Sequence, residues 1–283
     1  MKSIKIKCPA KINLTLEIVN KRDDGFHNIK SIMQLIDLYD YLTIKINPTE
    51  NRNIILAGNN PELPYDNKNL VYKAAELFLN TAGVNSYTVE IYIEKNIPIA
   101  AGLAGGRTDA AGSLYGVNLL FAKQLSDKKL NELCAKLGSD LNVCLNGGCT
   151  LATSRGEITK KIPDIKSSVT LIKPKNLGIS AGEAYTKYAK QEVKPQNNMT
   201  EKMLIAILDG DNIQPYLYND LEYAVFDSYK ELQEIKQTYP KAIMSGSGST
   251  YFILENLKTS KLDSNYEFIN NLNFISHGVI EEI

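Results

Sequence analysis

The sequence has no excess charge of either sign, few cysteines and no long apolar run, and each absence excludes a class of protein. The 283 residues include 32 basic and 32 acidic side chains, so a broad basic surface for duplex nucleic acid has no support. No apolar run approaches the roughly 18 residues that would cross a bilayer, and residues 1–6 lack the apolar stretch of a signal peptide. We therefore expect a cytoplasmic protein without a nucleic-acid or membrane partner.

The four cysteines argue against a zinc site and against a disulfide framework. None of them stands in a C-x-x-C spacing, and a disulfide framework would be unusual in a chain of this length. We predict no metal held by protein ligands alone. Hydrophobic residues make up 43% of the chain and charged residues 23%, which leaves ample apolar surface for a globular core.

Hydrophobic periodicity predicts a mixture of strands and helices. Residues 4–8 and 12–18 alternate apolar and polar side chains, which places Lys11 and Asn13 on the face opposite the apolar one. The strand pattern returns later, and apolar stripes that follow capping residues predict helices. The further expected strands are 42–46, 87–93, 169–172 and 251–254, and the expected helices run from Asn69 to Gly83, from about Thr108 to Lys123, from Ser126 to Gly138, over 199–208 and over 219–238.

The order of these elements predicts an α+β fold in two halves. Strands and helices are interspersed without the regular βαβ alternation of a doubly wound sheet. The texture of the sequence changes after about residue 158, and the halves are expected to meet near residues 150–165.

The most informative segment is a glycine-rich loop between an expected strand and an expected helix. It reads Pro98-Ile-Ala-Ala-Gly-Leu-Ala-Gly-Gly-Arg-Thr-Asp-Ala-Ala-Gly112. Glycines let a backbone approach a ligand closely, and a helix start offers unpaired N–H groups to an anion. The alternative is an ordinary strand-to-helix turn. The spacing fits neither a P-loop, which needs Lys-Ser or Lys-Thr after the glycines, nor a G-x-G-x-x-G dinucleotide loop.

The same loop resembles the ATP-binding motif of the GHMP kinases. Residues 8–14, 21–27, 137–140 and 245–249 are similar to motifs of the branch that phosphorylates a cytidine-diphosphate sugar alcohol. The resemblance implies a two-domain α+β GHMP kinase fold, with an N-terminal ATP-binding domain at 1–158 and a C-terminal ferredoxin-like domain at 159–283. It also implies transfer of the γ-phosphoryl group of ATP to the 2-hydroxyl of a methylerythritol unit, in non-mevalonate isoprenoid synthesis.

The resemblance implies roles for two residues at the reacting hydroxyl. Asp140 matches the aspartate that takes the hydroxyl proton, and Lys11 matches the lysine that keeps this aspartate ionised and stabilises the developing negative charge. The strand pattern agrees, because it points Lys11 away from the apolar face. Taken singly, the alternatives are a solvated strand lysine and, for Asp140, a helix N-cap just after Gly138.

At the other end of the substrate, the resemblance implies a site for cytosine. Phe26 and His27 match an aromatic-histidine pair in which the ring stacks on the base and the histidine bonds its edge. Tyr185 matches the opposite aromatic of the sandwich, and Asn13 is expected to contact the substrate. The alternatives are a half-buried turn aromatic for Phe26 and a surface helix tyrosine for Tyr185.

The resemblance places ATP on the glycine loop and implies that Mg²⁺ arrives with the nucleotide, without an all-protein cage. The Ser245–Ser249 turn is expected nearby, although a tight turn before the next strand explains it equally well. The residues expected to bind ATP are Asn69, Lys95, Pro98, Gly102, Leu103, Ala104, Gly105, Gly106, Arg107 and Thr108.

Two positions depart from the family pattern. Arg107 stands where these kinases usually carry a small serine, and Asn142 stands where a proline commonly follows the catalytic aspartate. The guanidinium of Arg107 either adds donors for the phosphates or fills the pocket. Two alternative functions therefore stay open, a related GHMP kinase with a different alcohol substrate and a non-catalytic nucleotide-binding relative. We expect a small-molecule substrate and a monomer or weak homodimer.

Overall fold

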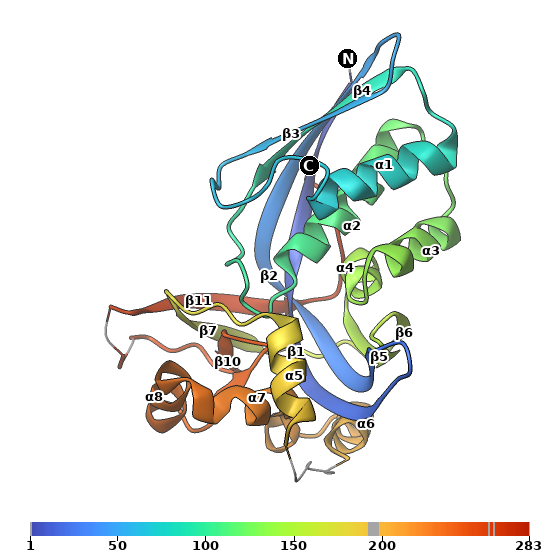
Figure 1. Ribbon diagram of the computed structural model, residues 1–283. Helices are drawn as coiled ribbons and strands as arrows, with labels where there is room; N and C mark the ends of the chain where they lie inside the picture. The colour runs from blue at the N-terminus through green and yellow to red at the C-terminus, as the bar shows by residue number, and fades with distance from the viewer. Residues whose placement is uncertain (1, 192–197, 260, 263, 283) are drawn as a thin grey trace.

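One long β-hairpin runs through the whole molecule. The computed structural model describes residues 2–191, 198–259, 261–262 and 264–282, and Figure 1 shows an elongated molecule in which this hairpin joins an upper and a lower half. Its strands are β1 (Lys2–Lys21) and β2 (His27–Pro48), which pair antiparallel from Lys2 opposite Ile46 to Lys21 opposite His27. The register shifts between Pro9 and Ala10 and again between Asn13 and Thr15, so two β-bulges flank the segment that carries Lys11.

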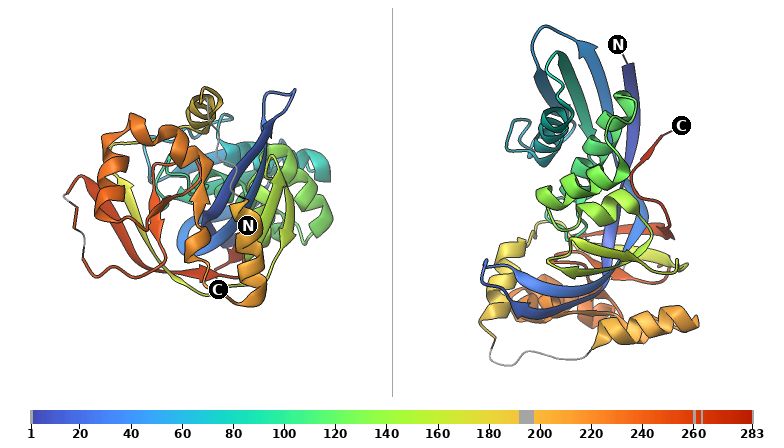
Figure 2. Two further views of the ribbon diagram at one scale, coloured as in Figure 1. Left: turned by 90° about the horizontal axis from the view of Figure 1, so that it is seen from below. Right: turned by 90° about the vertical axis from the view of Figure 1, so that its right-hand side faces the viewer.

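The upper half is a sheet covered by helices on one face (Figure 2). The strands β3 (Asn53–Gly58) and β4 (Tyr87–Glu94) continue the sheet beyond β2. A Cβ atom at Gly116 would meet Ile44 Cδ1 at 2.6 Å, so the helix that carries Gly116 packs directly on the hairpin. The helices of this half are α1 (Leu70–Ala82), α2 (Gly105–Leu120), α3 (Asp127–Leu137) and α4 (Leu141–Asn146).

Two of these helices begin and end where the sequence predicts. Asn69 caps α1 by accepting a hydrogen bond from Val71 N at 2.9 Å, and Gly83 ends the helix in the left-handed conformation at φ 68°. Ser126 caps α3 in the same way, through the N–H of Lys129, and α3 ends before Gly138.

The prediction for α2 is wrong at both ends. The helix begins at Gly105 rather than near Thr108, because the Ala104 carbonyl already accepts hydrogen bonds from Arg107 N and Thr108 N at 2.9 Å. It ends at Leu120 rather than Lys123, because Ala122 and Lys123 have positive φ values of 56° and 58°. Gly105 and Gly106 therefore belong to the first turn of the helix.

The lower half combines a second sheet region with several helices. Strand β7 (Ser168–Pro174) pairs with β10 (Tyr251–Ile253) and with β11 (Tyr266–Ile275), and β11 in turn pairs with β2. Tyr251, Leu232 and Ile172 lie fully buried in the core beneath the helices. The remaining elements are β5 (Cys149–Ser154), β6 (Ile158–Lys161), β8 (Tyr218–Asn219), β9 (Ile243–Met244), α5 (Ala181–Ala189), α6 (Met199–Asp209), α7 (Asp220–Val225) and α8 (Lys230–Thr238), with 3₁₀ turns at Gln214–Tyr216 and Phe226–Ser228.

The helix predicted over 219–238 is therefore wrong as a single element. Tyr229 has extended backbone angles, φ −135° and ψ 116°, which separate the 3₁₀ turn after α7 from the start of α8. The expected α+β class is confirmed, since strands and helices share both halves.

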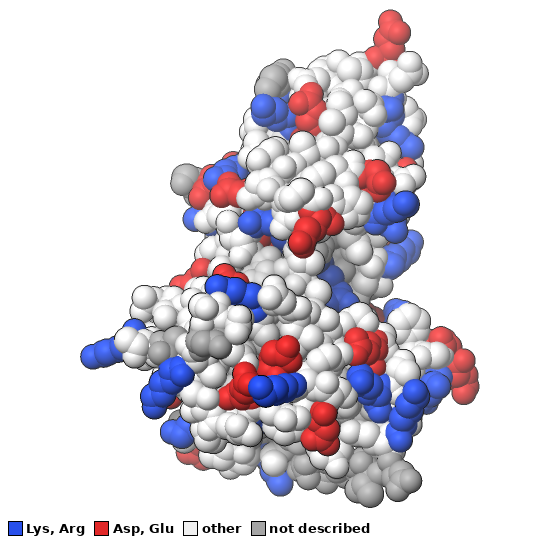
Figure 3. Space-filling view, turned by 60° about the vertical axis from the view of Figure 1, so that its left-hand side comes forward, with Lys and Arg blue, Asp and Glu red and all other residues white. Residues whose placement is uncertain are grey.

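The C-terminal segment of the described chain returns to the upper half, where the chain begins (Figure 1). The short strand β12 (Ile280–Glu281) pairs antiparallel with β1, where Ile6 lies opposite Glu281. Among the helices in the described ranges, none combines the length and apolar character that a membrane span requires. On the face that Figure 3 shows, basic and acidic side chains are interspersed, and no patch of one sign extends across it.

Candidate active site

Two neighbouring cavities open where the upper and lower halves meet. The larger one, about 540 Å³, is lined by residues of the hairpin, of the turn before α4 and of α5, including Lys11, Asp140 and Tyr185. The second, about 380 Å³, is lined by the glycine loop together with Asn69 and Lys95. The residues that line both cavities are Gly102, Arg107, Ala181 and Ser247.

The glycine loop is held on β1 and on the turn at 245–249. Lys11 N donates to Leu103 O at 3.1 Å, and the Ser245 hydroxyl donates to Gly102 O at 3.0 Å. A Cβ atom at Gly102 would lie 2.0 Å from Ser245 O, and φ at this residue is +76°, so only glycine fits here. The structure thus brings the second glycine-serine turn directly against the first glycine loop.

The loop leads into the N-terminus of α2, which faces the second cavity. The first N–H groups of a helix have no intrahelical acceptor, and the helix dipole adds positive potential there. A Cβ atom at Gly106 would meet no other atom within 4 Å, so the helix start is open. This arrangement suits the phosphate groups of a nucleotide.

Lys11 and Asp140, far apart in sequence, lie side by side in the larger cavity. Lys11 Nζ is 3.8 Å from Asp140 Oδ2 and donates to Asn13 Oδ1, and the Asn13 amide donates to the Ser31 hydroxyl at 2.8 Å. Lys11 is buried, which excludes a solvated strand lysine. Asp140 holds the N-cap position of α4, but its side chain makes no capping hydrogen bond, so the carboxylate is directed to the cavity instead.

Charge balance keeps Asp140 ionised. Burial by itself raises the pKa of Asp140, but the positive charges of Arg107 and Lys11 outweigh it and hold that pKa below its usual value. Burial also lowers the pKa of Lys11, and Arg107 adds to this effect while Asp140 opposes it. Asp140 is therefore an ionised carboxylate with the Lys11 ammonium group beside it, and an ionised carboxylate can accept a proton.

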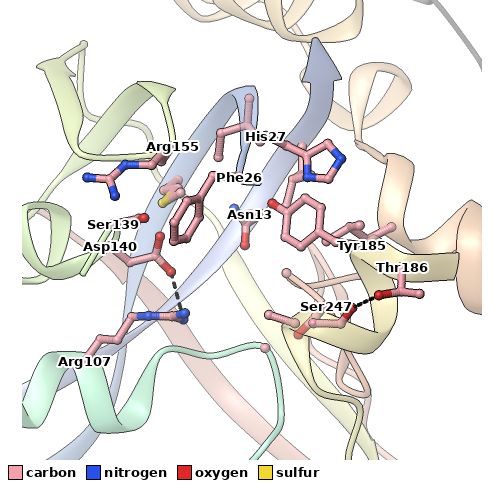
Figure 4. Close-up of a pocket in the computed structure, with 18 of the residues that line it drawn as sticks. Asn13, Phe26, His27, Arg107, Ser139, Asp140, Arg155, Tyr185, Thr186 and Ser247 are labelled. Atoms are coloured by element: carbon pink, nitrogen blue, oxygen red, sulfur yellow. Dashed lines mark hydrogen bonds and ion pairs between the residues drawn. The ribbon is translucent and has the colours of Figure 1, made fainter. Parts of the chain in front are cut away.

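Arg107 makes the closest ionic contact to this carboxylate. Its Nη1 atom lies 3.3 Å from Asp140 Oδ2, and Figure 4 shows the side chain reaching from the start of α2 across the cavity to the acid. Its side chain is 44% exposed, and it lines both cavities.

The far end of the larger cavity is aromatic. The rings of His27 and Tyr185 stack, with centroids 4.9 Å apart and planes 15° from parallel. Phe26, 54% exposed, lies across the cavity from Tyr185 in Figure 4, and Arg155 Cζ is 5.2 Å from the centroid of its ring. The structure therefore brings the three predicted aromatic and imidazole side chains to one end of one cavity.

The chain is similar over most of its length to kinases of known name. The family model for the GHMP kinases N terminal domain matches residues 69–150. The 4-diphosphocytidyl-2-C-methyl-D-erythritol kinase of Clostridium tetani is 39% identical, over 88% of this chain and 90% of that protein. The enzyme of the same name from Carboxydothermus hydrogenoformans is 40% identical, over 90% of each chain. The chain belongs to the 4-diphosphocytidyl-2-C-methyl-D-erythritol kinase family. It is an ATP-dependent phosphotransferase.

Solved structures agree with this family assignment. A 4-(cytidine 5'-diphospho)-2C-methyl-D-erythritol kinase superposes with a TM-score of 0.72 at 30% identity, covering 89% of this chain and 90% of that one. A homoserine kinase from Cytophaga hutchinsonii reaches a TM-score of 0.79 at 18% identity, covering 100% and 98%, which shows the shared fold alone. The expected GHMP kinase fold is confirmed.

The cavity lined by the glycine loop contains a buried ionic cluster that the sequence did not reveal. Lys95 Nζ pairs with Asp109 Oδ2 at 2.8 Å and with Asp40 Oδ2, and Asp40 Oδ1 accepts hydrogen bonds from the N–H groups of Asn96 and Ile97. Burial raises the pKa of Asp109, Lys95 opposes this rise, and Asp40 adds to it. Burial lowers the pKa of Lys95, but the two carboxylates outweigh it and raise that pKa.

The structure also places the second departure from the family pattern. Asn142 is buried in the first turn of α4, where its amide donates to Glu157 O at 3.4 Å. This contact links the segment that carries Asp140 to the β5–β6 turn. A side-chain hydrogen bond from Asn142 thus restrains the backbone at a position where the 4-diphosphocytidyl-2-C-methyl-D-erythritol kinases commonly carry a proline.

Sequence reasoning missed Arg155, which lies in that same turn. The Glu157 carboxylate accepts hydrogen bonds from Arg155 N at 2.8 Å and from Arg155 Nε at 3.4 Å, which holds the guanidinium at the cavity wall. The run Ser154-Arg-Gly-Glu157 between two alternating segments predicts a hairpin turn. Nothing in that pattern tells which cavity the turn faces.

Proposed function

We propose that this chain transfers the γ-phosphoryl group of ATP to the 2-hydroxyl of 4-(cytidine 5'-diphospho)-2-C-methyl-D-erythritol, in non-mevalonate isoprenoid precursor synthesis. The observation that carries the proposal is the position of Asp140 and Lys11. They lie in the larger cavity, between its aromatic end and the boundary with the cavity of the glycine loop. The names of the relatives, which join cytidine, a diphosphate and an alcohol, support this substrate.

The chemistry follows from the ionisation states of the two side chains. The ionised Asp140 accepts the proton of the substrate hydroxyl as the hydroxyl oxygen bonds to the γ-phosphorus and the bond from phosphorus to the bridging oxygen of ADP breaks. Lys11 stabilises the negative charge that develops on the attacking oxygen. Because Asn13 accepts from Lys11 Nζ, it orients the ammonium group as well as facing the substrate.

The nucleotide is assigned to the second cavity. The N–H groups of the loop and of the first turn of α2 bind the phosphates, and Asn69 and Lys95, which line the same cavity, are assigned to the adenosine. Asn69 also serves as the cap of α1, and its amide donates to Pro64 O at 2.8 Å, so its position is fixed. The residues assigned to ATP are Asn69, Lys95, Pro98, Gly102, Leu103, Ala104, Gly105, Gly106, Arg107 and Thr108.

Mg²⁺ is proposed to enter with ATP. The described residues contain no group of three or more His, Cys, Asp or Glu side chains that would hold a metal. A cation that takes most of its ligands from phosphate and water does not need such a group. When bound, the metal neutralises phosphate charge.

The cytosine base is assigned to the aromatic end. Phe26 and Tyr185 supply ring faces for stacking, and His27 supplies a ring nitrogen for the edge of the base. His27 and Tyr185 stack on each other at 4.9 Å, so the base enters beside this stack rather than between its two rings. Asn13 faces the substrate from β1.

We also propose the division of the chain into a nucleotide-binding domain at 1–158 and a second domain at 159–283. The hairpin strands belong to the first domain by sequence, but β2 pairs with β11 of the second. The proposed setting is a cytoplasmic monomer or weak homodimer.

The experiment is an ADP-release assay with purified protein, ATP and Mg²⁺, with and without the cytidine substrate. We expect substrate-dependent release that falls by at least 10³-fold in Asp140→Asn, because the base is lost while the volume is kept. ATP binding is expected to persist in that variant. Asp211→Asn, which changes an exposed carboxylate after α6, is the control and is expected to keep full turnover.

Each other outcome selects a different function. Release that requires another small alcohol identifies a related kinase, and in that case His27→Ala leaves turnover unchanged. ATP binding without release for any alcohol identifies a non-catalytic relative.

A further inference from the structure

The boundary between the two cavities has a single charged side chain. Of the four residues that line both cavities, Gly102, Ala181 and Ser247 are small and neutral, and Arg107 is the only cation there among the residues the structure describes. In phosphoryl transfer the γ-phosphoryl group leaves the nucleotide and bonds to the acceptor, so it must pass this boundary. Its three peripheral oxygens carry the charge of the transition state.

The two lysines near this boundary are already committed to other groups. Lys95 Nζ is held between Asp40 and Asp109, and both carboxyl groups contact it. Lys11 Nζ donates to Asn13 Oδ1 and faces Asp140, on the side of the larger cavity. Neither lysine lines both cavities.

Arg107 has donors left for a ligand. Its ion pair with Asp140 uses Nη1, whereas a guanidinium carries five N–H donors in a planar fork that matches phosphate oxygens. The backbone of Arg107 is fixed in the first turn of α2, where its N–H donates to Ala104 O at 2.9 Å. The side chain, at 44% exposed, is long enough to turn from Asp140 to a group at the boundary without any change of backbone.

We propose that Arg107 is a catalytic residue whose guanidinium pairs with Asp140 in the ligand-free enzyme and binds the peripheral oxygens of the phosphoryl group during transfer. This inference rests on the proposed function, because it takes Asp140 as the proton acceptor. It assigns Arg107 to the transition state rather than to the bound nucleotide alone. As the guanidinium turns to the phosphoryl oxygens, Asp140 loses one neighbouring cation and becomes a better acceptor for the hydroxyl proton.

The test separates kcat from nucleotide affinity in Arg107→Gln and Arg107→Lys. We expect kcat to fall by about 10²–10³-fold in Arg107→Gln, with the Kd for ATP nearly unchanged. Arg107→Lys is expected to recover only part of kcat, since an ammonium group lacks the fork of donors. The control is Arg52→Gln, which removes an exposed arginine whose guanidinium bonds Asn80 far from both cavities.

A second readout does not depend on the acceptor alcohol. ADP with aluminium fluoride, which mimics a phosphoryl group in transfer, is expected to bind the wild type more tightly than ADP alone, and Arg107→Gln is expected to lose this difference. Unchanged kcat in Arg107→Gln, or weaker ATP binding at unchanged kcat, overturns the inference and leaves the proposed function intact. A wild type that binds the fluoride complex through Arg107 but does not turn over the cytidine substrate supports the inference and refutes the substrate.

Discussion

The charge balance of the cavity lined by the glycine loop depends on Lys95. Replacing it by Met keeps a similar volume but leaves Asp40 and Asp109 buried side by side without a cation. Breaking a buried ion pair in this way costs about 3–5 kcal/mol. We therefore expect Lys95→Met to lower the free energy of unfolding by that amount at pH 7, measured by urea denaturation.

The pH dependence of this loss has a definite sign. Without Lys95, the pKa of Asp109, which burial already raises to about 8, is pushed higher, because the opposing charge is gone. A carboxyl whose folded pKa is raised above its unfolded value destabilises the fold at high pH, and the penalty shrinks as pH falls. Below about pH 8 the Asp109 carboxyl is protonated in both folded proteins, so the loss is expected to be nearly constant there and to grow above pH 8, where only the wild-type carboxyl ionises. Adding Asp109→Asn to Lys95→Met removes the titratable carboxyl and is expected to restore part of the stability; equal losses at pH 7 and pH 9.5 contradict this account.

At the scale of elements, the glycine loop offers a matched pair of substitutions. Gly102→Ala places a Cβ 2.0 Å from Ser245 O at a residue with φ +76°, so the loop must separate from the 245–249 turn. We expect a loss of at least about 1–3 kcal/mol in unfolding free energy and weaker binding of ATP. Gly106→Ala meets no atom within 4 Å at a helical position and is expected to leave stability unchanged or raise it by about 0.5–1 kcal/mol.

Urea denaturation curves of the two variants measure this difference in unfolding free energy. If Gly102→Ala is as stable as Gly106→Ala, the loop does not depend on its contact with Ser245.

The same elements show what could be predicted from the sequence. The ends of α1 and α3 follow from local capping residues, Asn69 and Ser126, which act within one turn of the chain. The start of α2 was misplaced because glycines favour loops on propensity, whereas here two of them continue a helix that begins at the carbonyl of Ala104. The break at Tyr229 lacks a proline or glycine and so carries no local signal.

The same distinction between local signals and long-range contacts separates the site residues that could be predicted from those that could not. Residues within contiguous motifs, such as Lys11 and Asp140, were predicted from the sequence by resemblance, and the structure brings them to one cavity. Asp40 and Arg155 were not found, because their positions depend on pairing between distant strands and on the direction of a turn. Periodicity also gave no reason for Lys11 to be buried; the bulges beside it and the pairing of two halves around it are properties of the assembled sheet.

At the scale of the whole molecule, the C-terminal segment stabilises α4, the helix that follows Asp140. Val279 is buried in the upper core, and its N–H donates to Cys144 O in α4 at 3.0 Å. Deleting residues 279–283 is expected to cost at least about 1.5–3 kcal/mol from Val279 alone and to lower kcat by disturbing Asp140. Thermal unfolding and the ADP-release assay measure the two effects.

The matched control lies in the same segment. Glu282→Gln removes only the partly exposed ion pairs with Lys5 and Lys7 and is expected to change stability by less than about 1 kcal/mol. Full activity and stability in the deleted chain would show that α4 holds its position without this segment.

The pairing of β1 with β12 has a consequence for the time at which the enzyme becomes complete. Strand β1 is made before β12, and one of its edges waits for Ile280 and Glu281. At the usual 5–20 residues per second, the interval is roughly 15–60 seconds. During that interval the first strand presents open hydrogen-bonding groups to other chains. The nascent chain is therefore exposed to misassembly at this edge of β1 until β12 has been made.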